Sequence, residues 1–349
     1  MDLTTLIERY RNRFDDQYGH RTTRQLNRAI DAVLSCHTER YGTMGLNCAS
    51  CGNQESRFHA CGNRSCHRCQ NHDTAQWLER QSRKLLPVEY FMVTFTLPYE
   101  LRALVWHHQK ILYSILFECA KSTLKDFGIN DKKLGADLAM TAVLHTHTRR
   151  LDYHPHVHII VPGGCLNQKR KQWTKLRGKY LFNEFALAKV FRARFLESVH
   201  NAGFMKPANV PNKWVVNCEH VGKGLPALQY LSRYLYRGVI SEKNIISDDG
   251  ANVTFRFIDS QTKTWKTRTV QGEQFIWLVF QHVLPKGFRR VRDYGFLHGN
   301  ARETLQRIQV MLNVLIPKPH KLPRPAFRCP HCGKPMSVIG FIPPAWRAG

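Results

Sequence analysis

The stretch His154-Pro-His-Val-His-Ile-Ile-Val-Pro162 is the part of the sequence that decides the fold. Its β-branched residues predict a strand over 156–161. Side chains alternate between the two faces of a strand, so His156 and His158 share one face, about 7 Å apart. Val157 and the alternate residues after it then face a core.

This histidine pair predicts a metal site. One histidine on an apolar strand is usually structural, but two on one face are difficult to bury unpaired, and both can bind one divalent ion. A second strand is predicted over 138–148, joined to the first by a hairpin turn, and its His145 and His147 also share a face. We expect His145 to be the third ligand. Such a site keeps open positions at which a metal can bind a substrate phosphate.

Two tyrosines on a predicted helix supply a candidate nucleophile. The helix spans 226–237, with Pro226 in its first turn and Gly238 just beyond its end. Tyr230 and Tyr234 are four residues apart and lie on one face. Such a pair is most often a packing feature. Beside a metal site it can act in catalysis, because a metal that polarises a phosphate compensates for the poor nucleophilicity of a phenol.

The charge of the chain indicates polyanionic partners. Its 349 residues include 52 lysines and arginines but only 26 aspartates and glutamates, so the net charge is +26. A hydrophobic fraction of 43% is typical of a globular protein, so the charge lies on a folded surface. The absence of a membrane-span or signal-peptide pattern predicts a cytoplasmic protein. A basic connector predicts DNA contacts and base stacking, with a solvated loop as the alternative; it contains Lys169, Arg170, Lys171 and Trp173.

The eleven cysteines predict zinc, because a reducing cytoplasm disfavours disulfides. Cys48-x2-Cys51 and Cys66-x2-Cys69 are separated by fourteen residues, which is the pattern of one tetrahedral site. Four thiolates leave no open position, so this zinc is expected to be structural. We also hypothesise a second zinc that joins the two ends of the chain, held by Cys36, Cys61, Cys329 and Cys332.

The sequence predicts an α+β protein of three parts. Residues 1–80 form a helical lead-in and the zinc-binding domain, residues 85–300 form the domain with the histidine strand, and residues 301–349 form a basic tail with a Cys-x2-Cys half-site. The expected elements are a helix over 21–35, strands over 89–98, 138–148, 156–161 and 213–218, helices over 101–127, 183–200 and 226–237, and a hairpin over 252–270.

An ordered series of motifs resembles a known family. His156-Val-His158 followed by Tyr230-x3-Tyr234 is similar to the HUH endonuclease superfamily of rolling-circle initiators, relaxases and transposases. The wider series resembles the zinc-binding, two-tyrosine transposases of bacterial insertion sequences called the IS91 group. It spans about residues 20–300 and comprises Cys48-x2-Cys51, Cys61, Cys66-x2-Cys69-Gln70, Phe95-Thr-Leu-Pro98, His145-Thr, His154-Pro-His-Val-His158, Tyr230-Leu-x-Arg-Tyr234-x-x-Arg237 and His282-Val-Leu-Pro-x-Gly-Phe288.

The resemblance implies a metal-dependent endonuclease and ligase of single-stranded DNA. His156 and His158 would hold magnesium or manganese, of which imidazole ligands favour manganese. Tyr230 and Tyr234 would attack DNA phosphates, leaving a 5′-phosphotyrosine and a free 3′-hydroxyl. The implied fold is a central antiparallel sheet flanked by helices. Its substrates would be single strands, with hairpins at the ends of the element.

Several alternatives stay open at the level of sequence. Arg233 and Arg237 would contact substrate phosphates or form surface ion pairs. A plasmid replication initiator or mobilisation relaxase would share the chemistry, although the cysteine-rich N-terminal region disfavours it. A non-catalytic zinc-dependent nucleic-acid-binding protein explains the charge and the cysteines but leaves the histidine strand and the tyrosine helix without a purpose.

Overall fold

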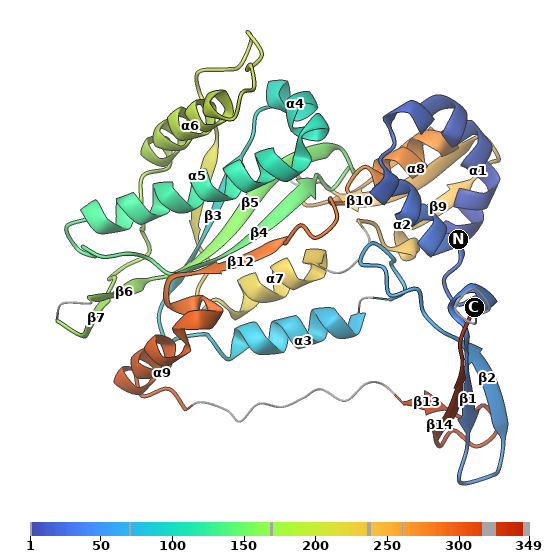
Figure 1. Cartoon of the computed structure of the whole chain (residues 1–349). Helices are drawn as coiled ribbons and strands as arrows, with labels where there is room; N and C mark the ends of the chain where they lie inside the picture. Colours follow the sequence, from blue (N-terminus) through green and yellow to red (C-terminus); the bar gives the residue numbers. More distant parts are fainter. Residues whose placement is uncertain are drawn as a thin grey trace.

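The computed structural model describes residues 2–69, 71–167, 170–235, 239–259, 261–315 and 326–344 (Figure 1). Its centre is a five-stranded antiparallel sheet in the order β12-β4-β5-β3-β8. The strands are β3 (Tyr90–Thr96), β4 (Met140–His147), β5 (Tyr153–Pro162), β8 (Val216–His220) and β12 (Val291–Tyr294). The predicted α+β class, the antiparallel sheet and the hairpin that carries the histidines are confirmed.

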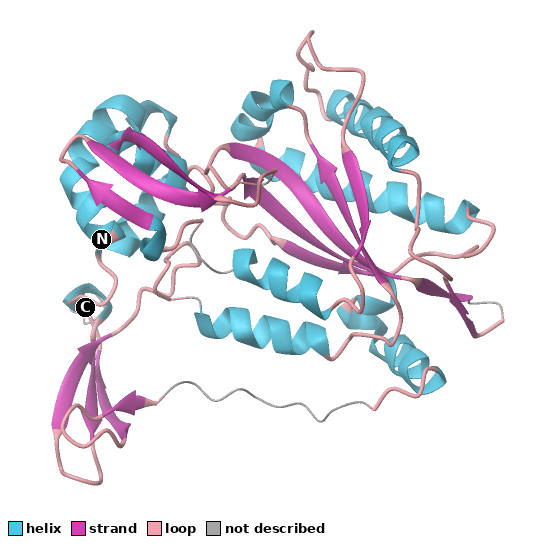
Figure 2. Ribbon diagram, turned by 180° about the vertical axis from the view of Figure 1, so that it is seen from behind, coloured by secondary structure: helices cyan, strands magenta, loops and turns pink. Residues whose placement is uncertain are grey.

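Helices cover both faces of this sheet (Figures 1 and 2). Long helices α5 (Gln109–Asn130) and α6 (Glu184–Asn201) bury one face, where Val157, Ile159 and Val161 enter the largest hydrophobic core as predicted. The opposite face packs against three helices, α3 (Asn71–Ser82), α7 (Leu225–Leu235) and α9 (Arg302–Met311).

The helix expected over 101–127 is two helices. His108 departs from helical backbone angles, with φ −124° and ψ 38°, and separates α4 (Arg102–His107) from α5. The ring of His108 packs on Phe204 where the two helices meet, with 4.4 Å between ring centroids.

The basic connector, for which a loop is the alternative, begins within a hairpin of β6 (Gly164–Asn167) and β7 (Gln172–Lys175).

The N-terminal helices share a core with a segment far along the chain. Helices α1 (Leu3–Tyr18) and α2 (Arg24–Leu34) pack on α8 (Gly272–Phe280) and on a sheet of β9 (Ile245–Asp248), β10 (Asn252–Ile258) and β11 (Trp265–Gln271). The contact between α1 and α8 is tight, because a Cβ atom on Gly272 would lie 2.3 Å from the Tyr10 ring. The predicted unit of residues 1–80 therefore does not bury its apolar helix faces alone, because residues 245–280 complete them.

One segment from the N-terminal part of the chain and one from the C-terminal part form a fourth sheet in the described residues, which we call the terminal sheet. Its order is β13-β14-β1-β2, with β1 (Thr43–Asn47), β2 (Gln54–Phe58), β13 (Phe327–Arg328) and β14 (Pro335–Ile342). The tail predicted over 301–349 packs on other parts of the chain: α9 lies on the central sheet and β14 pairs with β1. No helix in the described residues is long and apolar enough to span a membrane.

Candidate metal centre and nucleophile

Three histidines meet on the face of the central sheet that is covered by α7. His145 of β4 lies opposite His156 of β5 in the strand register, and His158 follows on the same face. The ring of His145 lies 4.4 Å from that of His158 and 5.4 Å from that of His156, centroid to centroid. All three are buried, and one ring nitrogen of each lies within 4.8 Å of the others. The structure thus brings together the three predicted ligands.

Hydrogen bonds orient two of these imidazoles. Nδ1 of His156 donates to the backbone carbonyl of His154 at 2.6 Å, which leaves the lone pair on Nε2. Nδ1 of His158 lies 2.9 Å from Oγ1 of Thr94, which stands beside it in the register of β3 and β5. Metal-binding histidines characteristically make such a bond through the nitrogen that does not bind the metal.

Burial keeps the three imidazoles neutral. It lowers the pKa of His156 to about 4 and holds the pKa of both His145 and His158 well below the ordinary value. The neutral imidazole is the form that binds a metal. Three neutral nitrogens on one face therefore fit a divalent ion with open coordination positions, and imidazole favours manganese over magnesium.

Tyr230 of α7 lies next to this cluster. Its ring stands edge-on to that of His158, with 6.0 Å between the centroids and 87° between the planes. The helix approaches the sheet closely at Gly224, where a Cβ atom would lie 2.8 Å from the Tyr90 ring and φ is +84°. Tyr234 lies one turn further along α7, but its side chain and that of Arg233 lie outside the described residues, as does the whole of Arg237.

Arg102 is a candidate functional residue that sequence reasoning missed. Its guanidinium contacts Nδ1 of His154 and lies over the ring of the exposed Tyr99, 5.1 Å from the centroid. Burial lowers its pKa, and within the described part of the chain no carboxylate comes within 4.0 Å of it. The available signal was its position just after the Phe95-Thr-Leu-Pro98 motif. Thr94 precedes the same motif, but a threonine in a strand carries no distinguishing signal.

The His282-Val-Leu-Pro-x-Gly-Phe288 motif joins the cysteine-rich loop to the histidine strand. His282 is buried, its Nε2 donates to the carbonyl of Leu151 at 3.0 Å, and its ring lies 5.1 Å from that of His147. His147 thus packs between His282 and the His145 ring, and it is not one of the three histidines whose ring nitrogens converge. Arg64 donates at 2.7–2.8 Å to three carbonyls of the motif, those of Leu284, Pro285 and Phe288.

The structure describes part of the predicted DNA-contacting connector. Arg170 and Lys171 are exposed at the turn between β6 and β7, and Lys169 lies outside the described residues. Trp173 packs against Phe296, with ring centroids 5.7 Å apart, and over Gly164, whose added Cβ atom would lie 2.4 Å from the indole. These contacts give Trp173 a packing role and lend no support to its predicted stacking on bases.

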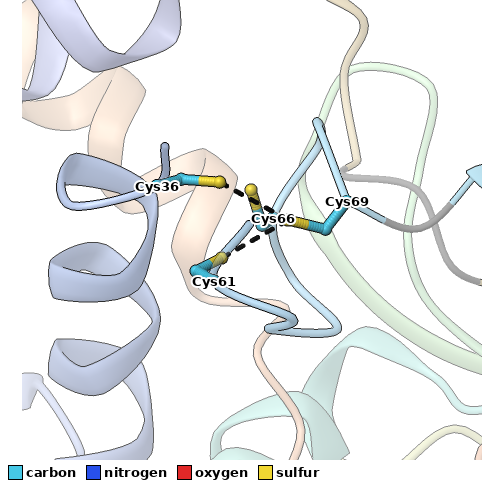
Figure 3. Close-up of side chains that lie close together, drawn as sticks. All are labelled: Cys36, Cys61, Cys66 and Cys69. Carbon is cyan, nitrogen blue, oxygen red and sulfur yellow. Dashed lines mark hydrogen bonds between the residues drawn. The ribbon is translucent and has the colours of Figure 1, made fainter. Parts of the chain in front are cut away.

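The eight predicted zinc-ligating cysteines form two clusters, in a different grouping from the predicted one. Figure 3 shows the first, in which Sγ of Cys69 lies 3.4 Å from Sγ of Cys36 and 3.5 Å from Sγ of Cys61, with Cys66 completing the group. The second comprises Cys48, Cys51, Cys329 and Cys332. The predicted site of Cys48, Cys51, Cys66 and Cys69 is therefore wrong, because the β1–β2 hairpin directs its cysteine pair toward the C-terminal segment.

Comparisons with known proteins identify the class of protein. A family model described as "Transposase zinc-binding domain" matches residues 6–97, and one described as "Putative transposase" matches residues 139–304. The two matched regions together span most of the chain and define it as a transposase with a zinc-binding domain.

Similarity to individual transposases identifies the family of the chain. The chain is 31% identical to "Putative transposase y4qJ" of Sinorhizobium fredii, over 93% of this chain and 87% of that one. It is 26% identical to the "Transposase for insertion sequence element IS801" of Pseudomonas savastanoi pv. phaseolicola, over 90% and 83%. Among solved structures, the conjugative relaxase TrwC in complex with DNA aligns over 64% of this chain and 74% of that chain, at 13% identity and a TM-score of 0.27. The chain belongs to the IS91 family of insertion-sequence transposases.

Proposed function

We propose that this transposase cleaves and rejoins single-stranded DNA through a covalent 5′-phosphotyrosine, with Tyr230 as the first nucleophile. The observation that carries the proposal is the position of the Tyr230 ring, edge-on to His158 at the margin of three buried, neutral histidines. A phenol held beside a candidate metal site is a nucleophile beside an activator of phosphate. Family membership supports an insertion sequence as the substrate and a cytoplasmic, DNA-associated enzyme.

The proposed reaction is a phosphoryl transfer in which a tyrosine–phosphate ester replaces the DNA phosphate ester that is broken. Oη of Tyr230 loses its proton to solvent and forms a bond to the scissile phosphorus. The bond from phosphorus to the 3′ oxygen breaks, and that oxygen takes up a proton to become a free 3′-hydroxyl. A divalent ion held by His145, His156 and His158 would neutralise charge on the phosphate when bound. Reversal of the step with a new 3′-hydroxyl rejoins the strand without a nucleotide cofactor.

The surroundings of the histidines support a phosphate in this place. Arg102 adds a cation with no carboxylate partner in the described part of the chain, and it contacts His154, whose ring lies 5.2 Å from that of His156. A guanidinium binds phosphate oxygens with its planar fork of donors. Tyr234, one turn beyond Tyr230, would serve as the second nucleophile in a later strand transfer. Arg233, Arg237, Lys169, Arg170 and Lys171 would hold the DNA backbone of single strands and of hairpins at the element ends.

A covalent-adduct assay tests this function. Purified protein is incubated with labelled single strands from the element's own ends, with manganese, with magnesium, or with EDTA at a concentration that leaves the zinc content unchanged. We expect a band on a denaturing gel that contains both protein and the DNA 3′ of the cut, and only with the added ion. Binding of these strands with no adduct under any condition would instead support a zinc-dependent DNA-binding protein without catalysis.

The role of Arg102 gives a second test, made without added divalent ion so that no cleavage intervenes. Arg102→Ala is expected to weaken binding of single-stranded DNA by about tenfold and to lower the slope of log affinity against log salt by roughly 0.7, because one phosphate contact is lost. The matched control is Arg307→Ala, which removes an exposed arginine of α9 whose partner is Glu303. An unchanged salt slope in Arg102→Ala would show that Arg102 serves the fold alone.

A further inference from the structure

We propose that Cys48, Cys51, Cys329 and Cys332 bind a second structural zinc ion that fastens the two ends of the chain together. The matched zinc-binding domain covers residues 6–97, so two of these four ligands lie far outside it. The site is independent of the proposed strand-transfer chemistry, and it is distinct from the cluster of Cys36, Cys61, Cys66 and Cys69.

The sulfur positions match one tetrahedral ion. Sγ of Cys48 lies 3.5 Å from Sγ of Cys332, and Sγ of Cys51 lies 3.6 Å from Sγ of Cys329. Zinc–sulfur bonds of about 2.3 Å in tetrahedral geometry place the sulfurs about 3.8 Å apart. All four cysteines are free thiols, so each can supply a thiolate.

Both halves of the site have the same backbone structure. In each Cys-x2-Cys-Gly turn the glycine donates its N–H to the carbonyl of the first cysteine, Gly52 to Cys48 at 2.8 Å and Gly333 to Cys329 at 2.9 Å. The two glycines have nearly equal φ, +71° and +70°, a region that favours glycine. Two segments with no common sequence neighbourhood therefore adopt one turn and face each other.

Backbone N–H groups point at the sulfurs in the same pattern in both halves. The first cysteine of each pair, Cys48 or Cys329, accepts from the N–H groups two and three residues further on. The second, Cys51 or Cys332, accepts from the N–H two residues further on, which belongs to Asn53 or Lys334. Hydrogen bonds of this kind stabilise thiolates, which are the form that zinc binds.

The terminal sheet has little else to hold it together. Its buried cluster consists of Leu46, Cys48, Cys329 and Met336, while Ile339, Phe341 and Ile342 of β14 are exposed. Small units with so small a core generally need a metal or a disulfide in order to fold. The bound ion would connect residues 278 and 284 positions apart in the chain, and its loss would release β13 and β14 from β1.

Zinc analysis of the full chain tests the site directly. We expect two zinc ions per chain, and one in the Cys329→Ser/Cys332→Ser double variant. The matched control, Cys119→Ser, changes a lone cysteine of α5 and should keep two. The single variant Cys332→His offers zinc a nitrogen in place of the sulfur, so it should keep two zinc ions per chain. One zinc per unaltered chain, or two in the double variant, would overturn the proposal.

Amide hydrogen exchange separates loss of this site from general unfolding. In the double variant, exchange should accelerate in β1 and β14 and stay unchanged in β4 and β5, which belong to the central sheet. Unchanged protection of β1 would overturn the proposal, since the terminal sheet would then not depend on the metal. The adduct assay is read separately, so failure of the proposed strand transfer leaves this result intact.

Discussion

Tyr230→Phe is expected to abolish formation of the covalent protein–DNA complex, with a loss of roughly a thousandfold or more in rate. The substitution removes the attacking oxygen and keeps the ring, which packs with the cluster of Leu228, Leu231 and Trp77 under the central sheet. Folding and affinity for single-stranded DNA should therefore be retained. The measurement is the rate of adduct formation on a denaturing gel, together with DNA binding of the same preparation.

Two other tyrosine variants make this result specific. Tyr99→Phe removes a hydroxyl from an exposed ring near Arg102 and should cleave at the normal rate. Tyr234→Phe should still form the first adduct and lose only the second transfer. Full activity in Tyr230→Phe, with loss in Tyr234→Phe, would assign the first attack to the other tyrosine.

His158→Ala is expected to lower the affinity for Mn²⁺ by more than about a hundredfold and adduct formation by a similar factor, because a direct ligand is lost. The substitution Thr94→Val should lower the Mn²⁺ affinity less, by about tenfold to a hundredfold. It leaves His158 in place and deletes only the hydrogen bond that orients its ring. The measurement is calorimetric titration of zinc-loaded protein with Mn²⁺, followed by the adduct assay.

The comparison of His158→Ala with Thr94→Val distinguishes loss of metal binding from simple misfolding. His107→Ala serves as the matched control, since it removes an exposed histidine from α4, and its Mn²⁺ affinity should equal that of the unaltered chain. Circular dichroism and the zinc count verify that each variant is folded. Unchanged Mn²⁺ affinity in folded His158→Ala would show that the three histidines hold no catalytic ion.

Local sequence patterns predicted those parts of the site that one element carries alone. The alternation of a strand places His156 and His158 on one face, and helical spacing places Tyr230 and Tyr234 one turn apart, whatever surrounds them. The hairpin joining β4 to β5 follows from a short connection between two apolar strands, which brought His145 opposite His156. These features depend on backbone geometry over a few residues, so a single sequence is enough to predict them.

Tertiary structure decided every relation between distant segments. Each Cys-x2-Cys pair is half of a site, and spacing does not specify which other pair completes it; the pairing of β1 with β14 does, and it joins Cys48 to Cys332. The same holds for the N-terminal helices, whose apolar faces are completed by α8. It also holds for Arg102, which reaches His154 because α4 packs against β5. The sequence by itself thus determined which side chains carry the chemistry. Their partners depend on how all the apolar faces are buried at once, which local periodicity does not encode.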